Sequence, residues 1–279
     1  MHNREEPSFD RGKFRRSASI DDICKIDSKA NRCVPFIAVP TTAGTGSEAT
    51  LFAVITDEEN KKKAFASTKF LPDVVLLGAA LTLSVPKKTT AYTAIDALSH
   101  LVEAAVSLYA PAFRDDVAEA PQTAAEIFRA LPRVLADPQD LAARQTLLLA
   151  SHKAGFAFRR TGTGYIHAVA HRLGEFYHLP HGYAIAAVFS AVLRASRPYV
   201  DKPLSAFAAA CGCGSSADDF LAAADRLIAD AGIDIGKVRV GTEDLDEIVR
   251  KAQDEAKVVG YPKPFSDNVL RQLIKDTLC

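Results

Sequence analysis

Cysteine is scarce in this sequence. Only five cysteines occur among 279 residues, and no two of them have C-x-x-C spacing. An odd number of cysteines in a chain of this length does not indicate a disulfide framework. The cysteine content therefore predicts a protein of the reducing cytoplasm. The five are Cys24, Cys33, Cys211, Cys213 and Cys279.

The sequence also carries no net charge. The 34 basic residues (Lys and Arg) are balanced by 34 acidic ones (Asp and Glu), so no overall field attracts nucleic acid or an anionic membrane. Short basic runs at 15–16 and 61–63 have no aromatic residues between them, which is typical of a solvated surface. We expect a small-molecule substrate and no nucleic-acid or membrane partner.

Long apolar runs are absent too. No run reaches the roughly 18 residues of a membrane-spanning helix, and the N-terminal stretch MHNREEPSFDRGKFRR has no apolar signal core. Residues 1–32 are polar and weakly periodic, so we expect a frayed or incomplete start. These features predict a soluble, cytoplasmic protein.

The secondary-structure signals in the sequence change near Pro86. Before it, short apolar runs bounded by turn residues predict strands at Val34–Val39, Leu51–Thr56 and Val74–Leu77. After it, strand signals end and helical periodicity takes over. We expect an α/β piece over residues 1–86 and an all-helical piece over 87–279. The predicted helices are Thr90–Leu108, Glu119–Leu131, Leu141–Ala157, Ile166–Phe176, Ala184–Ala195, Ala217–Ala231, Glu243–Lys257 and Asp267–Thr277.

Histidines gather in two places. Asp96 and His100 are four residues apart, as are His167 and His171, so each pair shares one helix face; His181 follows closely. Any single histidine on an apolar helix is more often an ordinary core or surface residue. Five of the seven histidines, however, lie at 100 or between 167 and 181, and buried imidazoles need a partner. Imidazoles with one carboxylate suit Fe or Zn better than Mg or Ca, so the pattern predicts a metal centre between helices.

Three segments resemble the iron-containing (group III) alcohol dehydrogenases. They are PTTAGTGSEAT (40–50), AIDALSHLVEA (94–104) and HAVAHRLGEFYHLPHG (167–182). The resemblance implies a dehydroquinate synthase-like architecture, in which a cleft between a Rossmann-like nucleotide-binding domain and a helical domain holds NAD or NADP and one metal. It implies Fe²⁺, with Zn²⁺ possible, held by Asp96, His100, His167 and His181.

The resemblance also implies roles for other residues. His171 corresponds to a non-ligating histidine beside the nicotinamide, where it handles the proton. Glycerol dehydrogenases and dehydroquinate synthases usually use one Asp and two His, so His100 points to the alcohol dehydrogenase branch. Gly44 and Gly46 allow close backbone approach in the Thr/Gly loop (residues 41–47). The expected cofactor contacts come from Thr41, Thr42, Thr45, Ser47 and Lys62.

One family feature has no counterpart here. The Gly-Gly-Gly-Ser segment that holds the pyrophosphate upstream of the Thr/Gly loop is missing, so the nucleotide-binding domain is expected to be incomplete. The stretch CGCGSSADD (211–219) is no substitute, because no strand precedes it and its serines and acids are typical of a helix N-cap.

The expected activity is a metal-dependent interconversion of an alcohol and an aldehyde or ketone with NAD(P), by hydride transfer. A homo-oligomer is among the expected assemblies. Two alternatives stay open: a metal-binding helical module or truncated paralogue without dehydrogenase activity of its own, and a gene fragment whose other half is encoded separately.

Overall fold

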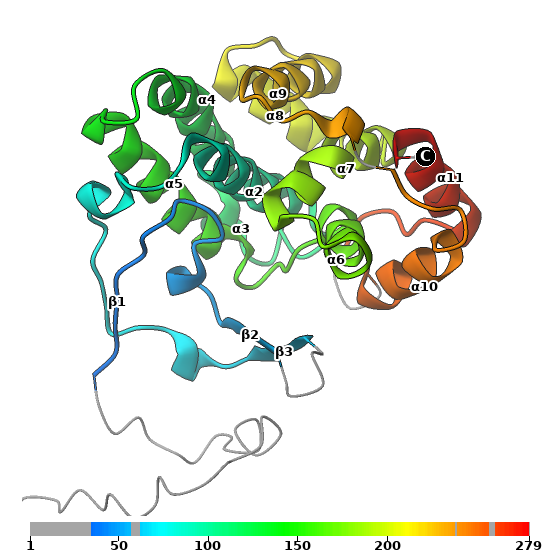
Figure 1. Cartoon of the computed structure of the whole chain (residues 1–279), viewed down its shortest axis with the longest axis horizontal. Helices are drawn as coiled ribbons and strands as arrows, with labels where there is room; N and C mark the ends of the chain where they lie inside the picture. The colour runs from blue at the N-terminus through cyan, green and yellow to red at the C-terminus, as the bar shows by residue number, and fades with distance from the viewer. Residues whose placement is uncertain (1–34, 57–61, 238, 257–259, 279) are drawn as a thin grey trace, which may run out of the picture.

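Most of the molecule is a helical assembly with a small strand-containing segment on one side (Figure 1). The computed structural model describes residues 35–56, 62–237, 239–256 and 260–278. Its helices confirm the predicted all-α C-terminal part. They are α2 (Lys87–Val106), α3 (Arg114–Val117), α4 (Ala120–Ala136), α5 (Leu141–Phe158), α6 (Tyr165–Tyr177), α7 (His181–Ala195), α8 (Asp201–Cys211), α9 (Ala217–Asp230), α10 (Leu245–Ala256) and α11 (Asp267–Leu278).

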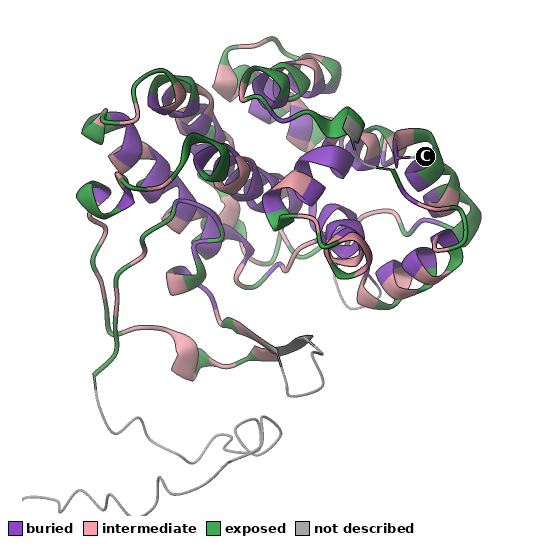
Figure 2. Ribbon diagram, viewed as in Figure 1, coloured by how far each residue is buried: buried purple, intermediate pink, exposed green. Residues whose placement is uncertain are grey.

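Helix α2 forms the centre of this assembly. It packs against α4, α5 and α7, and its side chains are buried around most of the helix, including Ile95, Leu98 and Leu101. A helix that is apolar on all sides is stable only inside a core. The alanines of its sequence, KKTTAYTAIDALSHLVEAAV, let neighbouring helices approach closely. Figure 2 shows buried residues along this helix and on the inner faces of its neighbours. Asp96 and His100 are therefore held in the interior of the protein.

The strands form two small sheets. Strands β1 (Ile37–Ala38) and β4 (Val74–Val75) pair in parallel, and β2 (Phe52–Thr56) pairs with β3 (Lys62–Ala66) as an antiparallel hairpin. Short 3₁₀ turns link them: η1 (Ser47–Ala49), η2 (Thr68–Phe70) and η3 (Ala79–Thr82), with η4 (Ile235–Lys237) further along. This agrees with the expected incomplete α/β segment. The division at Pro86, directly before α2, stays a prediction.

Three helices or strands were not predicted: β3, the short helix α3 (Arg114–Val117) and α8. Strand β3 begins in a lysine run, which gives no strand signal, and becomes a strand by pairing with β2. Helix α8 carries Pro203 in its first turn, where a proline costs no intrahelical hydrogen bond. The interpretation of residues 211–219 is confirmed: Ser216 caps α9, and its side chain and that of Asp219 form a reciprocal capping box.

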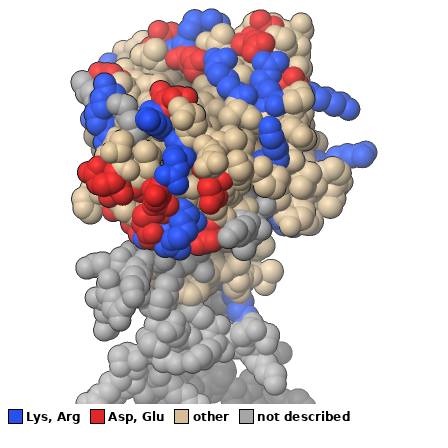
Figure 3. Space-filling model, turned by 90° about the vertical axis from the view of Figure 1, so that its right-hand side faces the viewer, with Lys and Arg blue, Asp and Glu red and all other residues tan. Residues whose placement is uncertain are grey.

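Charges of both signs share the surface. Figure 3 shows basic and acidic side chains interleaved on one face, as the balanced composition leads one to expect. Among the described residues, no helix has both the length and the apolar character needed to cross a membrane.

Candidate metal centre

Three helices bring a carboxylate and three imidazoles to one point. Helix α2 supplies Asp96 and His100, α6 supplies His167, and His181 is the first residue of α7. Asp96 Oδ1 lies 3.4 Å from His167 Nε2, 3.2 Å from His181 Nε2 and 3.8 Å from His100 Nδ1. The structure thus brings together all four residues expected to bind metal.

The atoms that meet there have no hydrogen-bond partners. Asp96 Oδ1, His100 Nδ1 and His167 Nε2 are buried, and none makes a hydrogen bond to any described residue. One donor atom from each of these three residues lies within 4.8 Å of the others, and His181 adds a half-exposed imidazole at the edge. Leaving such atoms unsatisfied costs about 1–3 kcal/mol each. Three imidazoles and a carboxylate form a donor set that suits Fe²⁺ or Zn²⁺, so the residues fit a metal ion.

The local electrostatics keep Asp96 charged and His100 neutral, which are the protonation states in which these side chains bind a metal. Burial alone raises the pKa of Asp96, but His100, His167 and His181 outweigh it and hold the pKa well below its ordinary value. Burial lowers the pKa of His100 to about 3 despite the charge of Asp96, so that imidazole is neutral at pH 7. His167 differs: burial lowers its pKa, but Glu103 and Asp96 outweigh that effect and raise it to about 10.

Three further residues support this cluster: Thr45, which was expected at the cofactor, and Glu103 and Phe158, which the sequence analysis did not indicate. The Thr45 hydroxyl donates to Asp96 Oδ2 over 3.2 Å, which leaves Oδ1 facing the histidines. Glu103, wholly buried, places Oε2 2.5 Å from His167 Nδ1. The ring of Phe158 stacks on His100 with centroids 4.1 Å apart. Glu103 follows Asp96 by seven residues on α2, and this i, i+7 spacing is a signal that would have indicated it.

His171 lies beside the cluster. Its ring stacks on that of His181 with centroids 5.3 Å apart, and its Nδ1 lies 2.6 Å from Glu255 Oε1 of α10. Arg172 Nη2 donates to the other oxygen of Glu255 over 3.1 Å. Burial lowers the pKa of His171, although Glu255 opposes this. The side chain is 40% exposed, so it connects the centre with solvent.

The Thr/Gly loop lies directly on helix α5. Ser151 Oγ donates to Gly44 O over 2.9 Å, and a Cβ at Gly46 would lie 2.1 Å from Ser151 O. Gly46 also has a φ of 63°, so this position requires glycine. The close approach holds Thr45 against Asp96.

The other residues expected at the cofactor are spread out. Thr41, Thr42 and Ser47 are exposed, and Ser47 borders a hollow of about 540 Å³ that Phe36, Val39 and Phe52 also line. Lys62 belongs to β3, but its side chain lies outside the described residues. Their contact with a cofactor stays a prediction.

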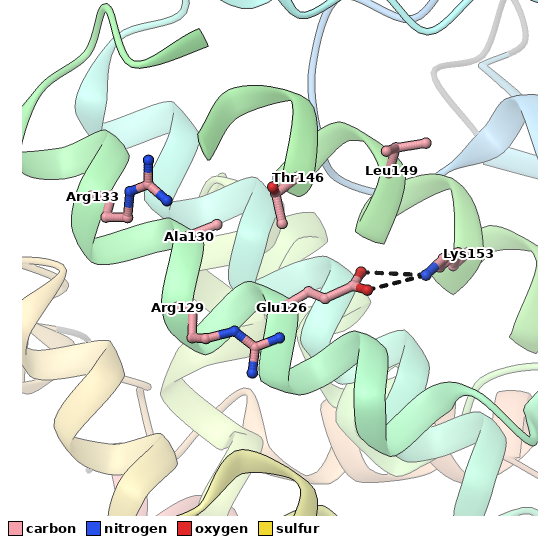
Figure 4. Close-up of a pocket in the computed structure, with 7 residues that line it drawn as sticks. All are labelled: Glu126, Arg129, Ala130, Arg133, Thr146, Leu149 and Lys153. Atoms are coloured by element: carbon pink, nitrogen blue, oxygen red, sulfur yellow. Dashed lines mark hydrogen bonds and ion pairs between the residues drawn. The ribbon is translucent and has the colours of Figure 1, made fainter. Parts of the chain in front are cut away.

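A second hollow, of about 370 Å³, lies between α4 and α5 (Figure 4). Lys153 Nζ donates to both carboxylate oxygens of Glu126 across it, over 3.2 and 3.4 Å. None of its lining residues belongs to the histidine cluster, so it does not extend the metal centre. The lining residues are Glu126, Arg129, Ala130, Arg133, Thr146, Leu149 and Lys153.

Comparison with known proteins matches both parts of the chain to one family. The model of the "Fe-containing alcohol dehydrogenase family, C-terminal" matches residues 90–278, and that of "Iron-containing alcohol dehydrogenase" matches residues 13–79. The probable alcohol dehydrogenase EutG of Escherichia coli is 43% identical over 202 residues, which are 72% of this chain and 51% of that protein. The 1-propanol dehydrogenase PduQ of Salmonella typhimurium is 35% identical over 87% of this chain and 69% of its own length.

A solved structure gives the same result. Sulfoacetaldehyde reductase from Bifidobacterium kashiwanohense, in complex with NAD⁺, superposes with a TM-score of 0.81 at 28% identity, over 94% of this chain and 70% of that one. The chain thus spans from about half to about two thirds of the length of these relatives.

Proposed function

We propose, from the premise that the chain belongs to the Fe-containing alcohol dehydrogenase family, that it interconverts an alcohol and an aldehyde or ketone with NAD or NADP at one divalent metal. The supporting observation is the meeting of three unpartnered buried donor atoms, from Asp96, His100 and His167, beside the imidazole of His181. These four residues would hold Fe²⁺, or alternatively Zn²⁺. A bound ion of this kind acts as a Lewis acid that polarises a substrate oxygen.

The chain's own residues prepare the centre for that chemistry. Asp96 supplies a fixed negative charge, and Thr45 holds its carboxylate in orientation. His100 is neutral at pH 7, and Phe158 covers one face of its ring and excludes water there. The centre is therefore dry on the side of α2 and opens towards His181 and His171, whose side chains are 41% and 40% exposed.

His171 is the residue we propose to move the proton. Its Nδ1 is engaged by Glu255, so Nε2 is the nitrogen available to exchange a proton with substrate or water. An imidazole suits this task because it can both accept and donate a proton. The partial exposure of the side chain gives the proton a route to solvent.

The cofactor assignment rests on the family and on the Thr/Gly loop. Related sulfoacetaldehyde reductase is in complex with NAD⁺, and the loop here exposes Thr41, Thr42 and Ser47 to solvent while its Thr45 reaches Asp96. We propose that these residues, with Thr45 and Lys62, contact the nicotinamide cofactor, which carries the hydride. Small alcohols or aldehydes would be the substrates.

One observation favours a second candidate, a metal-binding module without dehydrogenase activity of its own. Strands β1 and β4 form a two-stranded parallel sheet with exposed apolar residues, Ile37 by 54% and Val74 by 46%, and Leu76, directly after β4, is 53% exposed. Parallel sheets are normally covered on both faces. The strand segment that would carry the cofactor is thus incompletely covered, while the four proposed metal ligands lie together.

One assay separates the two candidates. Protein loaded anaerobically with Fe²⁺ or Zn²⁺ is mixed with NADH or NADPH and a panel of short aldehydes, and cofactor absorbance is followed. Oxidation of the cofactor that is lost in Asp96→Asn supports the dehydrogenase. Stoichiometric metal binding without turnover supports the module, and failure to bind metal contradicts both.

A further inference from the structure

Glu103 is a buried carboxylate that none of the proposed steps uses. Its side chain is 0% exposed, and it lies on α2 one helical turn beyond His100. A carboxylate shielded from water costs several kcal/mol unless charges or hydrogen bonds compensate it. Its surroundings therefore indicate what it does.

Each oxygen of Glu103 has one partner, and both partners belong to the start of α6. Oε2 lies 2.5 Å from His167 Nδ1, and Oε1 accepts the backbone N–H of Ile166 over 2.8 Å. The two contacts fix the carboxylate as well as the imidazole ring. Among the described residues, only Ile166 and His167 form hydrogen bonds to the Glu103 carboxylate.

The absence of a side chain at Gly164 leaves room for the Glu103 carboxylate. A Cβ at this position would lie 2.7 Å from Glu103 Oε1 and 2.5 Å from the ring of Tyr261. Any larger residue would therefore displace the Glu103 side chain from the end of α6. The contact of Glu103 with the start of α6 therefore depends on glycine at position 164.

The contact decides which nitrogen of His167 faces the cluster. Because Nδ1 donates its hydrogen to Glu103, the lone pair that can bind a metal is on Nε2. Nε2 is the unpartnered buried atom that lies 3.4 Å from Asp96 Oδ1. Charge agrees with this arrangement, since the carboxylates of Asp96 and Glu103 together balance a divalent cation.

We propose that Glu103 is a positioning residue of the metal centre: it holds His167 with Nε2 towards the ion and supplies a second negative charge that offsets the charge of a divalent cation. The proposal rests on the metal-binding part of the proposed function. It does not depend on catalysis by the chain, so binding measurements test it.

The test compares metal affinity among three proteins. Glu103→Gln keeps the shape and an oxygen for the Ile166 N–H but removes the charge. Asp116→Asn is the matched control, because Asp116 is also a buried, paired carboxylate but contacts Arg159 and Arg160 away from the centre. Affinities for Zn²⁺, and for Fe²⁺ without oxygen, are measured by chelator competition, and the thermal unfolding of each metal-free protein is recorded.

We expect Glu103→Gln to bind both ions about 10–100-fold more weakly, and Asp116→Asn to bind them as the wild type does. A role in capping α6 alone would instead lower metal-free thermal stability and leave affinity unchanged. Equal affinity of Glu103→Gln and wild type overturns the proposal and leaves the metal centre standing. A wild type that binds neither ion overturns the metal centre and this proposal together.

A second measurement needs no variant, which covers the case that Glu103→Gln does not fold. Long-range ¹⁵N–¹H correlation spectra of the Zn²⁺-loaded wild type report the tautomer of each imidazole. His167 is expected to carry its hydrogen on Nδ1 and to bind through Nε2. Binding through Nδ1 overturns the proposal.

Discussion

Occupation of the metal centre should raise the stability of the protein strongly. Asp96 Oδ1, His100 Nδ1 and His167 Nε2 are buried without hydrogen bonds, and each such atom costs about 1–3 kcal/mol. Relief of all three is thus worth about 3–9 kcal/mol. Mass action gives a similar figure, about 4 kcal/mol at a free metal concentration of 1,000 Kd. At about 2–4 °C per kcal/mol for a chain of this size, Tm should rise by about 8–16 °C.

The assay is thermal unfolding followed by circular dichroism, with the protein first in EDTA and then in excess Zn²⁺. His167→Ala should lose most of the shift. His152→Ala is the matched control, because His152 pairs with Glu48 and contacts none of the proposed metal ligands, so it should keep the full shift. A wild type with the same Tm in both conditions, or a His167→Ala variant with the wild-type shift, would refute the reasoning.

Three further outcomes follow from individual contacts. His171→Ala should keep one equivalent of metal by elemental analysis yet lose about 10²–10⁴-fold in turnover, and loss of metal would instead place His171 among the ligands. Gly46→Ala should destabilise by more than about 1 kcal/mol in urea titrations, since its Cβ meets Ser151 O at 2.1 Å and its φ is 63°; wild-type stability would contradict this. Burial raises the pKa of Asp116, but Arg160 and Arg159 outweigh burial and lower the pKa in the folded protein. The ion pairs of Asp116 therefore stabilise the fold at a pH above the unfolded-state pKa of about 3.9. This stabilisation is lost as the pH falls through the lower folded-state pKa. Urea titrations from about pH 6 to pH 3 should therefore show a smaller acid-dependent loss in Asp116→Asn, and equal losses would speak against this pair.

The helical part could be predicted from sequence because its signals are local. Periodicity gave eight helices after Pro86, and all eight are present with ends shifted by a few residues. Helix α7 begins at His181 rather than at Ala184, because Pro180 starts the helix one turn before the apolar run. Strand pairing is not local, which is why β3, stabilised by its partner β2, was missed.

The candidate site likewise has local features that the sequence predicts and non-local contacts that it does not. The pairs Asp96/His100 and His167/His171 follow from i, i+4 spacing, and the structure places both pairs at one point. Glu255 could not be predicted in the same way, because it is 84 residues from His171 and reaches it only through the packing of α10 on α6. Thr45 was expected at the cofactor, and only the close contact of its loop with α5 shows that its hydroxyl reaches Asp96.

The central claim is that one metal ion binds between α2, α6 and α7, and an anomalous difference map tests it most directly. Crystals of protein prepared without oxygen and loaded with Fe²⁺ would be measured at the iron absorption edge. We predict one peak per chain, at about 2.0–2.2 Å from His100, His167, His181 and one oxygen of Asp96. The absence of a peak, or a peak that Asp96 and His167 do not contact, would contradict the account.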